Sequence, residues 1–119
     1  MKPNLEDLTG RLIAFRDARD WRQFHSMKNL ILSASLEAAE IMELVQWKDD
    51  EAVEHGAQGD ADFRARLAEE CADVLLYLLL ICERAGIDLT EAAVAKIELN
   101  EKKYPVEKAR GNAKKYTEL

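Results

Sequence analysis

Two acidic pairs with the same spacing place the strongest constraint on this chain. Glu37 and Glu40 lie three residues apart in one predicted helix, and Glu70 and Asp73 repeat that spacing in another. Positions i and i+3 share a face of an α-helix, so each of two otherwise apolar helices carries two neighbouring carboxylates. Burying four carboxylates is costly unless a positive group lies between them. An antiparallel pairing of the helices could bring the four groups together around a cation, although the spacing alone does not require it.

The chemistry of these side chains favours a hard divalent cation. Such ions prefer oxygen ligands, and Mg²⁺ is usually held by a few carboxylates together with the phosphates of a substrate. A di-iron site is the main alternative metal centre, but it normally needs Glu-x-x-His on two helices, and no histidine stands at that distance from Glu40 or Asp73. Oxygen-only ligation therefore indicates Mg²⁺, or Mn²⁺ as a substitute. The simplest alternative is that each acidic pair is ordinary solvated helix surface.

Composition points to one small helical domain that covers residues 1–119. Hydrophobic residues make up 48% of the chain and charged residues 34%, as in a folded, helix-rich protein, whereas five glycines and two prolines offer little turn chemistry for a sheet. The apolar run Val74–Cys82 is richer than one lone bundle needs. We therefore expect an all-α fold that is completed by assembly with further copies of the chain.

Capping signals and periodicity together place four helices. The helices are predicted to run from Leu5 to about Asp20, from Met27 to Trp47, from Phe63 to Ala85 and from Leu89 to Tyr104. Their boundary signals are Asn4 and Ser26 as N-caps, Gly86 after the third helix, and Asp88 with Glu91 as a capping box. The segment Lys48–Asp62 is predicted to be a loop, and Val106–Leu119 to be extended or irregular.

Charge and cysteine usage exclude some classes of protein. The formal net charge of −6 argues against binding to a nucleic acid polymer, for which a basic surface supplies the affinity. Cys71 and Cys82 fall in one predicted helix, too far apart to bond to each other, and we interpret both as small core residues. No signal peptide and no apolar stretch of membrane-spanning length is recognisable. The chain is therefore expected in the cytoplasm, away from membranes.

Several further residues could belong to a site, although each has a simpler explanation. Trp21 and Trp47 lie near helix ends, where tryptophan is more often a lid on the core than a platform for a base. His25 is more often a hydrogen-bonding residue of a connector than a ligand. Asn100 and Lys103 share one face of the fourth predicted helix, where they could meet phosphates or face solvent.

A set of ordered segments resembles a known family. The segments are Arg19–His25, Lys28–Leu30, Glu37–Glu40, Gln46–Lys48, Glu69–Asp73, Val74–Leu78, Gly86–Leu89, Lys103–Gly111 and Lys115–Leu119. In this order they resemble the MazG-like, all-α nucleoside triphosphate pyrophosphohydrolases, and within them the dCTP pyrophosphatase-like branch. The Glu-x-x-Glu motif alone is weak, but the stretch Tyr-Pro-Val-Glu-Lys-Ala-Arg-Gly at residues 104–111 is specific.

The resemblance implies a four-helix MazG-like bundle, assembled as a homo-dimer or homo-tetramer, that uses Mg²⁺ to hydrolyse a nucleoside triphosphate to the monophosphate and pyrophosphate. The implied substrate is dCTP or a modified pyrimidine analogue, and the implied task is sanitation of the nucleotide pool. The implied metal ligands are Glu37, Glu40, Glu70 and Asp73, one of which would orient the attacking water. The implied contacts of the substrate are Trp21, His25, Trp47 and Tyr77 at the base and sugar, and Asn100, Lys103 and Tyr104 at the sugar and phosphates.

The sequence departs from the family pattern at two positions. Leu36 and Ala39 stand where the family usually has glycine before each acidic residue of the first pair. Bulkier side chains there could narrow the approach to the metals. An alternative of a different class is therefore a non-catalytic helical module that binds nucleotides or a partner protein through a degraded site, and a purely structural helical oligomer is a third.

Overall fold

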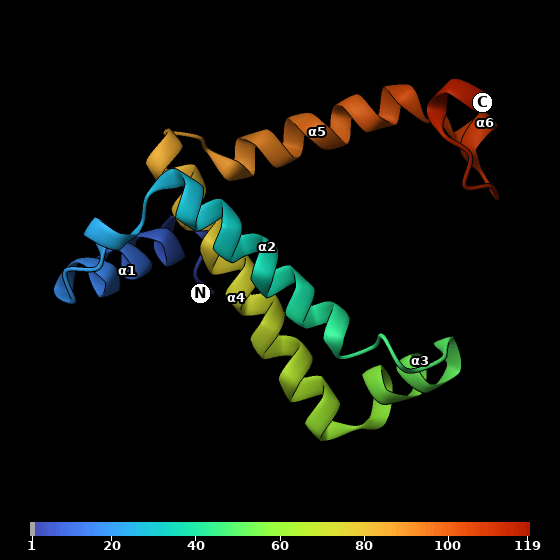
Figure 1. Cartoon of the computed structure of the whole chain (residues 1–119). Helices are drawn as coiled ribbons and strands as arrows, with labels where there is room; N and C mark the ends of the chain where they lie inside the picture. The colour runs from blue at the N-terminus through green and yellow to red at the C-terminus, as the bar shows by residue number, and fades with distance from the viewer. Residues whose placement is uncertain (1) are drawn as a thin grey trace. The chain divides into compact units, whose positions relative to one another are not determined.

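The computed structural model describes residues 2–119, which form two compact units divided after Gly86 (Figure 1). Every regular element in that range is a helix, so the predicted all-α fold is confirmed. Each of the four predicted helices is present, and two shorter α-helices accompany them.

Helices α2 (Met27–Glu43) and α4 (Ala61–Ala85) form the frame of the first unit. They lie side by side and run in opposite directions (Figure 1), as the acidic spacing permits. The Ser26 side chain accepts a hydrogen bond from the backbone N–H of Asn29, which confirms the predicted start of α2. Gly86 ends α4 in a left-handed conformation with φ of 68°, which a residue without Cβ adopts at little cost.

The buried core of this unit is small. Its buried apolar residues are Leu30, Leu44, Phe63, Leu79 and Leu80. Several large apolar side chains of α2 stay in contact with solvent, and Leu36 is the most open of them at 67% exposed. Burial of apolar surface is the main force that stabilises a fold, so a single copy leaves much of this potential stabilisation unused.

Helix α1 (Leu5–Ala18) packs against α4 and leads into a short 3₁₀-helix, η1 (Arg22–Phe24). Asn4 and Asp7 form the reciprocal pair of hydrogen bonds of a capping box, so the predicted start of this helix is confirmed. The helix ends at Ala18, slightly before the predicted end.

The segment Lys48–Asp62 contains a helix, α3 (Asp50–Gly59), so the prediction of a loop is wrong. Asp49 caps this helix by accepting the N–H of Ala52 at 2.9 Å. Its half-buried residues recur at helical spacing and are Val53, Gly56 and Ala57. A Cβ at Gly56 would lie 3.5 Å from the ring of Phe63, so a small residue allows α3 to pack closely on α4.

Helix α2 also ends earlier than predicted. It stops at Glu43, and the N–H groups of Val45 and Gln46 both turn back to the carbonyl oxygen of Met42. Trp47 therefore lies outside the helix, and 89% of it is exposed. Cys71 is likewise exposed, so the prediction of a core residue is wrong for it, whereas Cys82 is half-buried.

The second unit, Ile87–Leu119, contains one long helix followed by two short ones. They are α5 (Leu89–Lys103), α6 (Val106–Ala109) and the 3₁₀-helix η2 (Tyr116–Glu118). Asp88 accepts the N–H of Glu91 at 3.0 Å and starts α5 as predicted, and Pro105 follows its last turn. No residue of α5 is buried within the described chain.

The end of the chain folds back onto the end of α5, although it was predicted to be irregular. The rings of Tyr104 and Tyr116 meet edge to face, with centroids 6.2 Å apart. The ammonium group of Lys103 lies 4.7 Å from the centroid of the Tyr116 ring, a cation–π contact. No helix between residues 2 and 119 is long and apolar enough to cross a membrane.

Replacement of Gly86 by alanine is expected to destabilise the protein by about 1 kcal/mol, because a Cβ strains the left-handed backbone. Gly10 provides a matched control, since it lies inside α1 and a Cβ there would meet nothing within 4 Å. Gly10→Ala should stabilise the fold by about 0.5–1 kcal/mol. Unfolding by urea, followed by circular dichroism, measures both changes. Equal effects of the two substitutions would contradict the assigned end of α4.

Candidate functional site

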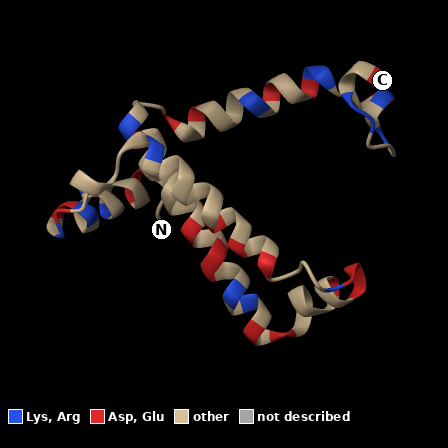
Figure 2. Cartoon of the chain, in the orientation of Figure 1, with Lys and Arg blue, Asp and Glu red and all other residues tan. Residues whose placement is uncertain are grey.

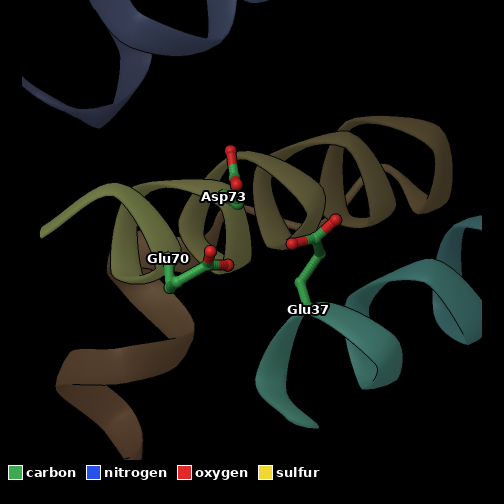
Figure 3. A group of neighbouring side chains, drawn as sticks. All are labelled: Glu37, Glu70 and Asp73. Atoms are coloured by element: carbon green, nitrogen blue, oxygen red, sulfur yellow. The ribbon is translucent and has the colours of Figure 1, made fainter. Parts of the chain in front are cut away.

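Carboxylates from α2 and α4 gather in the interface between these helices. Glu37 projects from α2, and Glu70 and Asp73 from α4, and one oxygen from each lies within 4.8 Å of the other two. Figure 3 shows Glu37 and Glu70 reaching toward one another, with Asp73 one turn further along α4. The antiparallel packing thus brings three of the four predicted acids together, and Figure 2 shows acidic residues along the same stretch of both helices.

Glu40, the fourth predicted acid, lies beside this cluster. A hydrogen bond shared with Glu40, followed by burial, raises the pKa of Glu70 from 4.5 to about 7, and the surrounding negative charges add to the effect. Burial, followed by a hydrogen bond with Glu40 and its charge, raises the pKa of Glu37. Glu40 therefore interacts with acids on both helices.

Within residues 2–119, no acid of this cluster forms an ion pair with a positive side chain. The Oε2 atoms of Glu37 and Glu70 are buried and have no hydrogen-bond partner among residues 2–119. A proton shared with Glu40 can satisfy such an oxygen, and so can a cation held between the helices. Close oxygen ligands and orphaned carboxylate oxygens fit a hard divalent ion, so the residues present suit the predicted kind of metal site.

A cavity of about 280 Å³ opens next to the acids, within the first unit. Its walls are formed by Leu12, Phe15, Arg16, Trp21, His25, Asp73, Leu76, Tyr77 and Leu80. Three of the predicted base-binding residues, Trp21, His25 and Tyr77, therefore share one cavity. Asp73 belongs both to this wall and to the acidic cluster, so the two features adjoin. The volume lies near the lower limit for ligand pockets, roughly 300 Å³, and suits part of a ligand such as a single ring.

Two aromatic rings in the cavity wall, those of Phe15 and Trp21, contact each other. Phe15 and Trp21 meet edge to face with centroids 5.6 Å apart. The N–H of Trp21 donates to the carbonyl oxygen of Arg16 at 3.1 Å, which turns the chain back at the end of α1. Burial, followed by the positive charge of Arg16, lowers the pKa of His25, so this ring is neutral at pH 7.

Arg16 is the pocket residue that sequence reasoning missed. Only 6% of it is exposed, and it is the one charged residue that is buried among residues 2–119. A signal was present, because Arg16 lies four residues after Leu12 and so extends the apolar stripe of α1. Charged residues are usually assigned to the surface, so the stripe did not lead to a prediction that Arg16 is buried in the cavity wall.

For the remaining predicted site residues, a place at the cavity stays a prediction. Trp47 is not among the residues that line the cavity, and its contact with a substrate stays a prediction. Asn100, Lys103 and Tyr104 belong to the second unit, so their relation to the cavity also stays a prediction. Leu36, one of the two residues that replace family glycines, is 67% exposed in the chain.

The raised pKa values predict how the metal-free protein responds to pH. Between about pH 4.5 and 7 the folded state binds more protons than the unfolded chain, so stability is complete at the acidic end and falls as pH rises. The melting temperature without metal should therefore decrease from about pH 5 to about pH 8. Glu70→Gln should flatten this decrease, and millimolar Mg²⁺ should oppose it by binding the folded state. A decrease that is identical in wild type and variant would contradict the assigned coupling.

Comparison with known proteins relates this arrangement to a family. Residues 32–119 match the sequence model of the MazG-like family. The chain is 43% identical over 119 residues to dCTP pyrophosphatase 1 of Bos taurus and to that of Homo sapiens, and each match covers 99% of this chain and 69% of the relative.

A solved structure agrees with these sequence relatives. The fold is similar to the crystal structure of a pyrophosphatase from Archaeoglobus fulgidus DSM 4304, with a TM-score of 0.76 and 41% sequence identity. That match covers 88% of this chain and 95% of the archaeal chain. The sequence resemblance is thus confirmed, and the chain belongs to the MazG-like family.

Proposed function

We propose that this chain is a Mg²⁺-dependent pyrophosphohydrolase that converts a nucleoside triphosphate to the monophosphate and pyrophosphate. The observation that carries the proposal is the shared position of Asp73, where an acidic cluster meets an aromatic cavity. The relatives named dCTP pyrophosphatase 1 support dCTP, or a modified pyrimidine analogue, as the substrate. Sanitation of the nucleotide pool is the corresponding task.

The acidic cluster is the proposed metal site. Glu37, Glu70 and Asp73 would hold Mg²⁺ through their clustered oxygens, and Glu40 would complete the set. Mn²⁺ is the expected substitute, because it accepts the same oxygen ligands. When bound, the ion neutralises phosphate charge and lowers the pKa of a bound water.

The residues of the chain position the reactants. The cavity holds the base between Trp21, His25 and Tyr77, which directs the triphosphate toward the acids beyond Asp73. One carboxylate of the cluster orients a water molecule for attack. A bond forms between the water oxygen and the α-phosphorus, and the bond from that phosphorus to the α,β-bridging oxygen breaks. Pyrophosphate leaves, and the carboxylate that orients the water takes its proton. The predicted contacts of Trp47, Asn100, Lys103 and Tyr104 with the substrate belong to this same proposal.

Assembly into a homo-dimer or homo-tetramer is part of the proposal. The buried core of one copy is small, whereas Leu32 and Leu36, one turn apart on the same face of α2, are 52% and 67% exposed. A second copy that covers this face would supply the missing apolar contacts. Free Cys71 and Cys82 agree with the cytoplasm as the proposed compartment, because thiols stay reduced there.

The reaction is tested by supplying the purified protein with Mg²⁺ and a panel of nucleoside triphosphates, and by separating pyrophosphate from orthophosphate. Wild type should release pyrophosphate and the monophosphate, fastest with a cytosine nucleotide. Glu40→Ala and Glu70→Gln should lose more than about 100-fold in rate, since even the outer partners of metal ligands are worth 10- to 100-fold.

Glu69→Gln is the matched control, because Glu69 precedes Glu70 on α4 but is exposed and lies outside the acidic cluster. It should keep the wild-type rate. Nucleotide binding without any release of pyrophosphate would instead support a non-catalytic binding module, and would make Leu36 and Ala39 the first residues to revert to glycine. Retained Mg²⁺-dependent turnover in Glu40→Ala would exclude Glu40 from the site.

The assembly is tested by measuring molar mass with light scattering after size-exclusion chromatography. Wild type should exceed the 13.5 kDa of one chain by a factor of two or four. Leu32→Glu should shift the mass toward one chain, because a charge at a covered apolar surface loses its hydration. Circular dichroism establishes that the variant remains helical. A wild type of monomer mass at micromolar concentration would reject this part of the proposal.

A further inference from the structure

A buried arginine in the wall of the cavity has no place in the chemistry of the acidic cluster. Arg16 is 6% exposed and lines the cavity together with Trp21, His25 and Tyr77. A guanidinium group stays charged at any physiological pH, so its burial is costly unless its N–H groups find acceptors. The acceptors that the structure provides show which of these N–H groups are already paired.

Two acidic side chains accept from only two of the N–H donors of the guanidinium. Nε of Arg16 donates to Oδ1 of Asp17 at 2.9 Å, and Nη1 donates to Oε2 of Glu83 at 3.4 Å. Arginine has five N–H donors, and the donors of Arg16 outside these two bonds have no acceptor among the residues that the structure describes. These two contacts fix the orientation of the group, and the unpaired donors on Nη1 and Nη2 remain available to a molecule in the cavity.

A second unpaired group lies in the same wall. Nδ1 of His25 is buried and has no hydrogen-bond partner among residues 2–119. A neutral imidazole offers one nitrogen as an acceptor and the other as a donor. The cavity thus combines several free donors of Arg16 with a free ring nitrogen of His25, between aromatic walls.

The edges of the nucleobases differ in how they match this pattern. The arginine fork donates best to two adjacent acceptors. Cytosine has such a pair in O2 and N3, and its exocyclic amino group next to them is a donor. In thymine and uracil N3 carries a hydrogen, so the adjacent pair of acceptors is absent.

We propose that Arg16 is a specificity-determining residue that selects cytosine by donating to its O2 and N3 atoms. His25 accepts a hydrogen bond from the neighbouring amino group of the base, and Asp17 and Glu83 hold the guanidinium in place. This inference rests on the proposed function, because it assigns the base of that same substrate. It adds a positively charged contact with the base edge to a cavity that also has aromatic and aliphatic side chains in its wall.

A purely structural role for Arg16 makes a different prediction. The contact with Glu83 links α1 to α4, so loss of Arg16 could simply loosen the cavity. Loosening would weaken binding of every base by a similar factor. If Arg16 instead binds the base edge, its loss weakens binding of cytosine alone. The ratio of kcat/KM between dCTP and dTTP therefore separates the two roles.

The experiment measures that ratio by pyrophosphate release for wild type, Arg16→Met and Arg16→Lys. Arg16→Met should lower kcat/KM for dCTP by about 10- to 100-fold and change that for dTTP by less than about threefold, since a bidentate arginine contact discriminates between bases to that extent. Arg16→Lys should also lose the preference, because it keeps the charge but not the fork. Arg11→Met is the control, as Arg11 is exposed on the same helix, and it should keep the wild-type ratio.

A double variant, Arg16→Met with Glu83→Met, removes the unpaired acid that the single variant leaves. It should regain thermal stability while the dCTP preference stays lost. Equal losses for both nucleotides, or a wild type that prefers dTTP, would overturn the inference and leave the pyrophosphohydrolase proposal standing. If wild type releases no pyrophosphate, that proposal fails instead. Calorimetric binding of deoxycytidine and thymidine without metal then decides the role of Arg16 by the same ratio.

Discussion

The packing of α2 against α4 places apolar side chains and carboxylates in one interface. Leu30 and Leu79 are almost completely buried, and each such side chain stabilises the pair by about 1.5–3 kcal/mol. Glu37 and Glu70 oppose the same packing, as their raised pKa values indicate. The apolar contacts therefore hold the acids closer together than their charges favour, which is the arrangement that a cation can relieve.

The end of α1 contributes the other half of the site. Its last turn delivers Arg16 to the cavity wall, and the backbone bond from Trp21 turns the chain so that Trp21 and His25 follow along the same wall. The bond from Arg16 to Glu83 ties this turn to α4, the helix that also carries Asp73. The cavity and the acidic cluster thus share one helix, which favours a constant distance between them.

The features that the sequence predicted correctly are those with a local physical signal. Asn4 and Ser26 start helices because their side chains satisfy backbone N–H groups a few residues away, and Gly86 ends one because of its backbone freedom. The acids were found because their spacing places them on one helical face. Helix α3 was missed because its polar composition concealed a narrow stripe of small residues, whose contact with Phe63 is tertiary. The apolar stripe of α1 includes the position of Arg16, but its acceptor Glu83 lies 67 residues away, and no local pattern reports that contact.

The position of Asp73 links the affinity of the cavity for its occupant to the affinity of the acidic cluster for a cation. Its carboxylate is counted among the oxygens of the acidic cluster and also among the walls of the cavity. A molecule that settles in the cavity changes the surroundings of this carboxylate, and a cation among the acids does the same from the other side. Thermodynamic reciprocity then requires that whatever the cavity occupant does to the affinity for the cation, the cation does equally to the affinity for the occupant. Because Asp73 belongs to both, the cavity and the acidic cluster form a coupled pair.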